Sequence, residues 1–258
     1  MHHRPARATS CLFRLVAISL FLATARASEP IAPDVDELIR RNTLALGGAE
    51  AMAAINTLQI ELRITEGNST IEGKYATDRS GRMRIDIHAG GKLVWIEALD
   101  GQTAWCREGG EAKPVLEGPD ASAALKHGLL LPGKIFSLRE IATRGVKLSL
   151  SGRELIEGVN YFVLQMSFPD GFANFVYLNP DSYLIERQRD FRAMHPDADL
   201  TKKRLEIRYS DFRKVAGVVH NFQEQTFNLD TGKLVQTATV TSLKCNAPLG
   251  EGVFAMPH

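Results

Sequence analysis

The chain has 258 residues, of which 44% are hydrophobic and 24% charged, so it is long and apolar enough to bury a sizeable core. Its 31 basic and 30 acidic residues give a formal net charge of +1, which excludes the strongly basic surface typical of nucleic-acid-binding proteins. We expect a single large domain after a separate N-terminal segment.

That segment, residues 1–27, has the form of a secretory signal peptide. Arg4, Arg7 and Arg14 precede an apolar run over residues 15–23, and residues 25–27 (Ala-Arg-Ala) resemble a cleavage site. A membrane anchor, the alternative, needs about 20 continuous apolar residues, roughly twice this run. We therefore predict cleavage near Ala27 and a soluble, periplasmic mature domain of residues 28–258.

Cleavage would remove four arginines and leave 27 basic residues against 30 acidic ones, a formal charge of −3. Cys11 precedes the apolar run, so it is not placed to accept a lipid. The mature chain keeps Cys106 and Cys245, for which both a disulfide and two free buried thiols are open.

The first mature element is predicted to be a helix. Asp34 is a suitable N-cap with an acid three residues later, and the glycines at 47 and 48 would end the helix. A short second turn is expected over residues 49–55. From Leu58 apolar and polar residues alternate, the pattern of a strand with one wet face.

More strands follow at short, regular spacing, over residues 69–78, 82–88, 92–99 and 103–108. Between residues 109 and 145 the strand pattern stops, and residues 119–143 predict two short helices, the first capped by Asp120 and the second stopped by Gly145.

Strands resume at residues 146–150 and continue to residue 244. Within this part, residues 158–189 predict three antiparallel strands joined by turns at Pro-Asp-Gly (169–171) and Asn-Pro-Asp (179–181). The predicted fold is α+β: a single, strongly curved antiparallel sheet of about eleven strands, a half β-barrel with helices covering its concave face.

Three patterns that could carry chemistry are weak. No Gly-x-Ser-x-Gly motif is present, residues 128–134 lack the Ser or Thr that should follow a phosphate-binding loop, and residues 195–199 (His-Pro-Asp-Ala-Asp) are interpreted as a solvated loop. We predict no enzyme activity, no catalytic residue, no metal and no cofactor.

The helical insertion is rich in apolar residues beyond what two short helices need. Leu129, Leu131, Phe136 and Leu138 are candidates for a reversible lid that binds ligand, against the alternative of an ordinary helix-on-sheet core. Trp95 and Trp105, on adjacent predicted strands, are further candidates, although core packing is favoured for both.

The order of elements resembles the LolA/LolB-like periplasmic carriers that sort lipoproteins to the outer membrane, and the related anti-sigma-factor-binding stress sensor. Four segments are similar to motifs of these proteins: Thr-Asp-Arg-Ser-Gly-Arg-Met-Arg-Ile (77–85), Leu-Asp-Gly-Gln-Thr-Ala-Trp (99–105), Asn-Pro-Asp-Ser-Tyr-Leu-Ile (179–185) and Val-Phe-Ala-Met-Pro (253–257). Ser80 stands where the carrier usually has proline.

The resemblance implies a periplasmic carrier or chaperone for acyl chains of lipids or lipoproteins, with transport toward the outer membrane. It leaves open a membrane-bound donor or acceptor protein as partner, and we expect a monomer without nucleic acid. The alternative function is a sensor that binds an apolar signal and a protein partner. Arg79 matches the carrier arginine that helps to close the helical lid, whereas the plain interpretation is a charge entering a turn.

Overall fold

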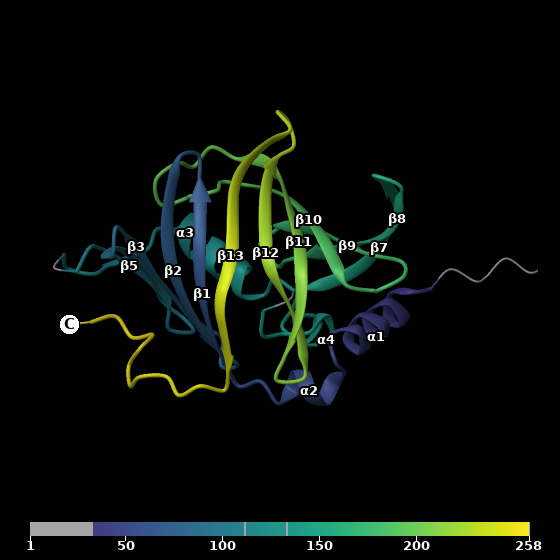
Figure 1. The fold of residues 1–258 in the computed structure, drawn as a ribbon, viewed down its shortest axis with the longest axis horizontal. Helices are drawn as coiled ribbons and strands as arrows, with labels where there is room; N and C mark the ends of the chain where they lie inside the picture. The colour runs from purple at the N-terminus through teal and green to yellow at the C-terminus, as the bar shows by residue number, and fades with distance from the viewer. Residues whose placement is uncertain (1–32, 111, 133, 258) are drawn as a thin grey trace, which may run out of the picture. The chain divides into compact units, whose positions relative to one another are not determined.

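The computed structural model describes residues 33–110, 112–132 and 134–257 (Figure 1). The predicted signal peptide and its cleavage site lie outside the described residues. From Pro33 onward the chain forms one compact unit. None of the helices described there is long and apolar enough to cross a membrane.

In the described residues, thirteen strands form one antiparallel sheet in the order β6-β5-β4-β3-β2-β1-β13-β12-β11-β10-β9-β8-β7. The strands are β1 (Thr57–Glu66), β2 (Ser69–Asp78), β3 (Arg82–Ala89), β4 (Lys92–Leu99), β5 (Ala104–Glu108), β6 (Val115–Leu116), β7 (Lys147–Ile156), β8 (Val159–Ser167), β9 (Ala173–Leu178), β10 (Ile185–Arg192), β11 (Lys203–Val215), β12 (Val218–Asn228) and β13 (Lys233–Cys245). The sheet is not closed, since β6 and β7 are its edges. Pairing of β1 with β13 joins two meanders.

The prediction of a single antiparallel sheet is confirmed, and two details are corrected. The count is thirteen rather than about eleven; one strand that was not expected is β6, whose two residues pair with Trp105 and Cys106. The class is mostly β rather than α+β, because the helices in the described residues have between 5 and 11 residues each.

Two of the predicted turns are stabilised by residues within the turns themselves. The side chain of Asn179 accepts hydrogen bonds from the amides of Asp181 (2.9 Å) and Ser182 (3.2 Å), which closes the turn before β10. Gly171 has a φ of 89°, a conformation that favours glycine, in the turn between β8 and β9.

The helices are α1 (Val35–Ala45), α2 (Ala49–Ala53), α3 (Pro119–Leu129) and α4 (Leu138–Thr143). Asp34 caps α1 as predicted, accepting from the amide of Glu37 at 2.8 Å. The predicted cap at Asp120 is wrong: the N-cap of α3 is Gly118, and Asp120 lies in the first turn. Ser137 and Glu140 form a capping box on α4, which fixes where that helix begins.

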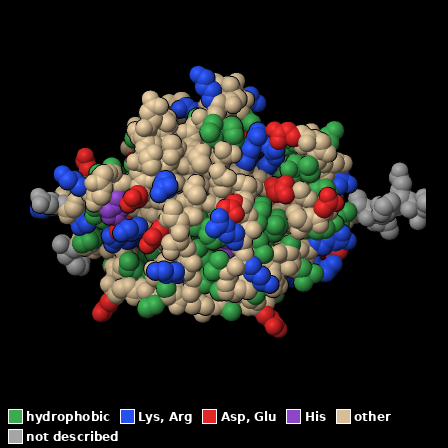
Figure 2. All heavy atoms as spheres, viewed as in Figure 1, with side chains coloured by type: hydrophobic (Ala, Val, Ile, Leu, Met, Phe, Trp, Pro, Cys, Tyr) green, Lys and Arg blue, Asp and Glu red, His purple; other side chains and the backbone are tan. Residues whose placement is uncertain are grey.

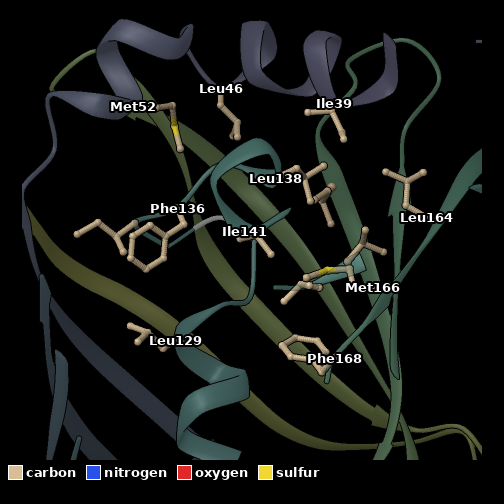
Figure 3. Close-up of a cluster of buried hydrophobic side chains, with 14 of the residues drawn as sticks. Ile39, Leu46, Met52, Leu129, Phe136, Leu138, Ile141, Leu164, Met166 and Phe168 are labelled. Carbon is tan, nitrogen blue, oxygen red and sulfur yellow. The ribbon is translucent and has the colours of Figure 1, made fainter. Parts of the chain in front are cut away.

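The main hydrophobic core lies between these helices and one face of the sheet, called here the helix-covered face (Figure 3). It combines Leu38, Ile39, Leu46 and Met52 from the N-terminal helices, Leu129, Phe136, Leu138 and Ile141 from the insertion, and Leu99, Phe162, Leu164, Met166 and Val176 from strands. Every helix thus contributes buried side chains to one core.

The opposite, outer face carries charged side chains (Figure 2) and has two small clusters of buried hydrophobic residues beneath them. Glu206 on β11 is fully buried there and pairs with Arg187 (2.8 Å), Arg189 (2.6 Å) and Arg208 (2.7 Å). Because three guanidinium groups surround this carboxylate, burial of its charge is compensated, and the pKa of Glu206 is lowered although burial alone would raise it.

Cys106 and Cys245 are both free. Four strands separate β5 from β13 in the sheet, so the two residues lie roughly 24 Å apart along it at about 4.8 Å per strand. A disulfide requires Cα atoms within about 7 Å. Burial, followed by the contact with Glu117, raises the pKa of Cys106 to about 12, so its reactive thiolate is disfavoured.

Glu97 is an acid in the helix-covered face, on β4 opposite Cys106. The pKa of Glu97 is raised from an ordinary 4.5 to about 7, mainly because the side chain is buried. The negative charges of Asp197 and Glu117 also raise this pKa, whereas a hydrogen bond from Trp95 and the nearby His195 lower it. The folded chain therefore keeps this proton over a pH range in which the unfolded chain has lost it.

Two leucines of the β7–β8 hairpin test the core. Leu164 is 0% exposed and Leu155 is 70% exposed. We expect Leu164→Ala to lower the free energy of unfolding by about 2–5 kcal/mol because it leaves a cavity, and Leu155→Ala to change it by less than about 0.5 kcal/mol. Urea unfolding measures both; equal effects would contradict the assignment of the core.

Glu97 predicts a pH-dependent stability. As pH rises from 4.5 to about 7, the folded state should lose up to about 3 kcal/mol relative to the unfolded state, since only the unfolded state has released the proton. Glu97→Gln should therefore stabilise the protein at pH 8 and have little effect at pH 4.5. Urea unfolding at pH 4.5 and pH 8 measures the effect, with the exposed Glu108→Gln as the control. If the stabilisation caused by Glu97→Gln were no larger at pH 8 than at pH 4.5, the prediction would be wrong.

Candidate functional site

The structure divides the predicted site residues into two groups. Leu129, Phe136 and Leu138 are buried together in the main core, with exposed fractions of 6%, 0% and 1%. Leu131 is half-buried and lines a cavity. In this structure Leu129, Phe136 and Leu138 pack as ordinary core, so these three could contact a ligand only if the helices moved.

The two tryptophans lie elsewhere. Trp105 is fully buried on the outer face with Ile96 and Ala98, where its Nε1 donates to the carbonyl oxygen of Phe254 at 2.9 Å. Trp95 is half-buried on β4 and donates to Glu97. The pairing of β4 with β5 was expected, but alternation alone did not show that the two rings would not share a site.

Arg79, directly after β2, contacts two helices and the segment that precedes the second one. Its guanidinium donates to the carbonyl oxygens of Met52 and Ile55 at the end of α2 and to the carboxylate of Glu140 on α4. It also reaches the carbonyl oxygen of Ile135 at 3.5 Å. A planar group with five donors suits such convergent acceptors.

Neighbouring charges reinforce this arrangement. Burial would raise the pKa of Glu140, but hydrogen bonds from Ser137 and Arg79 outweigh it and lower the pKa. The Arg144 guanidinium lies 3.9 Å from the centre of the Phe136 ring and donates to the carbonyl oxygen of Arg79 at 3.0 Å. Polar contacts therefore hold α4 and the segment before it against the end of β2.

Two nearby arginines do not contact the helices in this way. Arg82 pairs with Asp78 and lies 5.0 Å from the Phe254 ring, and Arg84 pairs with Asp86 and donates to the carbonyl oxygen of Val253 at 3.1 Å. Both act on the C-terminal segment. They are therefore suitable controls for Arg79.

A cavity of about 1290 Å³ adjoins α3. On the helix-covered face its lining includes Ala124, His127, Leu131, Lys134, Asp190, Tyr209, Glu224, Thr226 and Gln236. Outer-face residues such as Tyr177 and Arg189 also line it, so part of the volume continues around the sheet and only the remainder lies beneath α3. The wall beneath α3 mixes apolar and polar groups.

His127 fastens the C-terminal half of α3 to the turn between β8 and β9. Its ring stacks on Phe172 at 4.2 Å and meets the edge of Phe168 at 4.8 Å. Its Nε2 lies 2.7 Å from a carboxylate oxygen of Asp170. These partners lie more than 40 residues further along the chain, and only the fold brings them to His127.

The loop between β10 and β11 passes over one end of the sheet (Figure 1). His195 Nε2 lies 3.2 Å from both carboxylate oxygens of Glu66, at the end of β1. Ala193, Pro196, Leu200 and Lys202 line the cavity. The loop therefore connects two parts of the sheet and forms part of the cavity boundary. Among the described residues, no group of three or more His, Cys, Asp and Glu side chains is placed to hold a metal.

Comparison with known proteins rests on structure. No protein-family model matches the chain, and no curated protein matches its sequence. A DUF1329 family protein from Desulfovibrio piger has a TM-score of 0.56 at 13% identity, over 86% of this chain and 98% of the other. A LolA superfamily protein from Nitrosomonas europaea has a TM-score of 0.56 at 11% identity, over 86% and 98%.

A putative outer membrane lipoprotein-sorting protein domain from Vibrio parahaemolyticus is similar as well, with a TM-score of 0.55 at 13% identity, over 85% of this chain and 95% of that domain. Identities this low show the fold alone. The resemblance expected from the sequence is thus confirmed at the level of the fold, and the chain has the fold of a LolA superfamily protein.

Proposed function

We propose that the protein is a periplasmic carrier that shelters acyl chains of lipids or lipoproteins between its helices and the concave face of a half-barrel sheet. The observation that carries the proposal is the cavity of about 1290 Å³ beside α3, on a sheet with the LolA-like fold. Pockets for small ligands commonly measure about 300–1,000 Å³, so part of this volume would suffice.

The energetics favour an acyl chain as the occupant. Burial of a methylene group contributes about 0.8 kcal/mol, so a chain of about 16 carbons gains on the order of 12 kcal/mol. The buried leucines and Phe136 of the insertion would exchange contacts within the core for contacts with the chain. Such an exchange costs little hydrophobic energy, because both states keep these side chains out of water.

The lid proposed here is the insertion with α3 and α4, and Arg79 is its polar fastening. Four carbonyl and carboxylate acceptors converge on one guanidinium, so a single displacement releases several contacts. A lid held by apolar packing alone would compete strongly with an apolar cargo. Polar contacts that water can replace allow the closed and loaded states to differ by only a few kcal/mol.

The remaining parts of the proposal follow from the predicted signal peptide and the fold. A secreted carrier would act without enzymatic chemistry between a membrane-bound donor and an acceptor. The relative from Vibrio parahaemolyticus is described as a putative lipoprotein-sorting domain, which makes lipoprotein acyl chains a natural cargo.

Arg79→Leu tests the lid. We expect the variant to fold but to bind a fluorescent fatty-acid probe several-fold more tightly, because its closed form loses polar contacts with α2 and α4. Arg82→Leu and Arg84→Leu should change probe affinity much less. Probe titration and displacement by palmitate, measured beside thermal melts, give the comparison; equal affinity in all three variants would reduce Arg79 to a structural charge.

A further inference from the structure

Two buried polar side chains face each other across neighbouring strands of the helix-covered face. Asp190 on β10 is paired directly with Asn174 on β9, which is in turn paired with Met166 of the main core. Asp190 is 8% exposed and Asn174 is 0% exposed. Asp190 also lines the cavity beside α3.

One side of the Asp190 carboxylate is held by a polar network. The Tyr209 hydroxyl donates to Oε1 of Gln188 at 2.8 Å, which orients the amide so that its Nε2 donates to Oδ2 of Asp190 at 3.3 Å. Arg192 Nε donates to the same oxygen at 3.1 Å. The carboxylate is therefore fixed in direction before any ligand arrives.

The other side is unsatisfied. Oδ1 of Asp190 and both amide atoms of Asn174 have no hydrogen-bond partner among the described residues. Buried polar groups in folded proteins almost always have partners, so three unpaired atoms on adjacent residues need an explanation. Burial raises the pKa of Asp190, whereas Arg192, Gln188 and His127 lower it.

We propose that Asp190 and Asn174 form a polar subsite that binds the neutral, hydrogen-bonding head of an acyl cargo, a hydroxyl or an amide. This inference rests on the proposed carrier function and specifies its cargo. An ionised aspartate accepts hydrogen bonds, and an asparagine amide both donates and accepts. A hydroxyl or amide head satisfies both.

The charges next to Asp190 disfavour two simpler heads. A fatty-acid carboxylate would bring a second negative charge to Asp190, in a wall that also contains Glu224. An ammonium head would bring a further positive charge to a wall that already contains Arg192 and Lys134. Asp190 already has a positively charged partner in Arg192. A neutral acylglycerol or acyl amide keeps the buried charges matched.

Displacement of a fluorescent probe by three ligands with the same 16-carbon chain tests the subsite: 1-palmitoylglycerol, palmitamide and palmitate. On the unaltered chain we expect at least one neutral-headed ligand to bind about tenfold more tightly than palmitate. The stronger of the two identifies the head as a hydroxyl or an amide. Equal affinities for all three would overturn the subsite while leaving the carrier function standing, whereas failure of all three to bind would remove the carrier function itself.

Variants locate the effect. Asn174→Leu should reduce the preference for the neutral head to less than about threefold and leave the melting temperature unchanged or higher, because an apolar side chain of similar size needs no partner. Asp190→Asn should tighten palmitate binding several-fold by removing the opposing charge. Asp120→Asn, which removes an exposed acid from the cavity rim, should do neither. An unchanged preference in both Asn174→Leu and Asp190→Asn would overturn the proposal.

Discussion

One guanidinium, that of Arg79, connects the helices to the end of β2. An open antiparallel sheet with an apolar face must be covered, and here short helices cover it, none of which could bury its apolar side alone. Arg79 leaves the end of β2 and gathers the ends of α2, the segment before α4 and Glu140 into one polar contact. This contact aligns helices from two distant parts of the sequence over the same strands, while apolar packing supplies most of the stabilisation.

The main core and the cavity beside α3 differ in the side chains that line them. Leu38, Leu164 and Met166 are fully buried in the main core, whereas the wall of the cavity beside α3 mixes apolar and polar groups. Its boundary includes the His127 stack on Phe172 and the loop whose His195 contacts Glu66.

Strand alternation and turn chemistry were enough to predict the meander. Asn179 closes its turn with a side-chain hydrogen bond to the backbone two residues later, and Gly171 adopts a positive φ. Both effects depend only on neighbouring residues, so the sequence is enough to predict them. The edge strand β6 was missed because two exposed residues, Val115 and Leu116, carry no alternation. The cap of α3 was misassigned because a backbone conformation at Gly118, without a side-chain bond, starts that helix.

The candidate site was harder to predict for a different reason. Alternation states that two residues share a face of a strand, but not which face the helices will cover, so Trp105 was grouped with residues on the other side of the sheet. Asp190 and Asn174 lie on strands whose register becomes known only when the sheet is assembled. Arg79 was found only through the resemblance to the carriers, since nothing around it in the sequence points to α2 or Glu140.

The most direct test of the carrier account is mass spectrometry of the mature protein purified from the cells that make it, under conditions that preserve non-covalent complexes. The account predicts a bound acylated species that leaves on denaturation and that can be replaced by an added acyl ligand. A protein that carries no acylated species and co-purifies instead with a membrane regulator would contradict it in favour of a sensor.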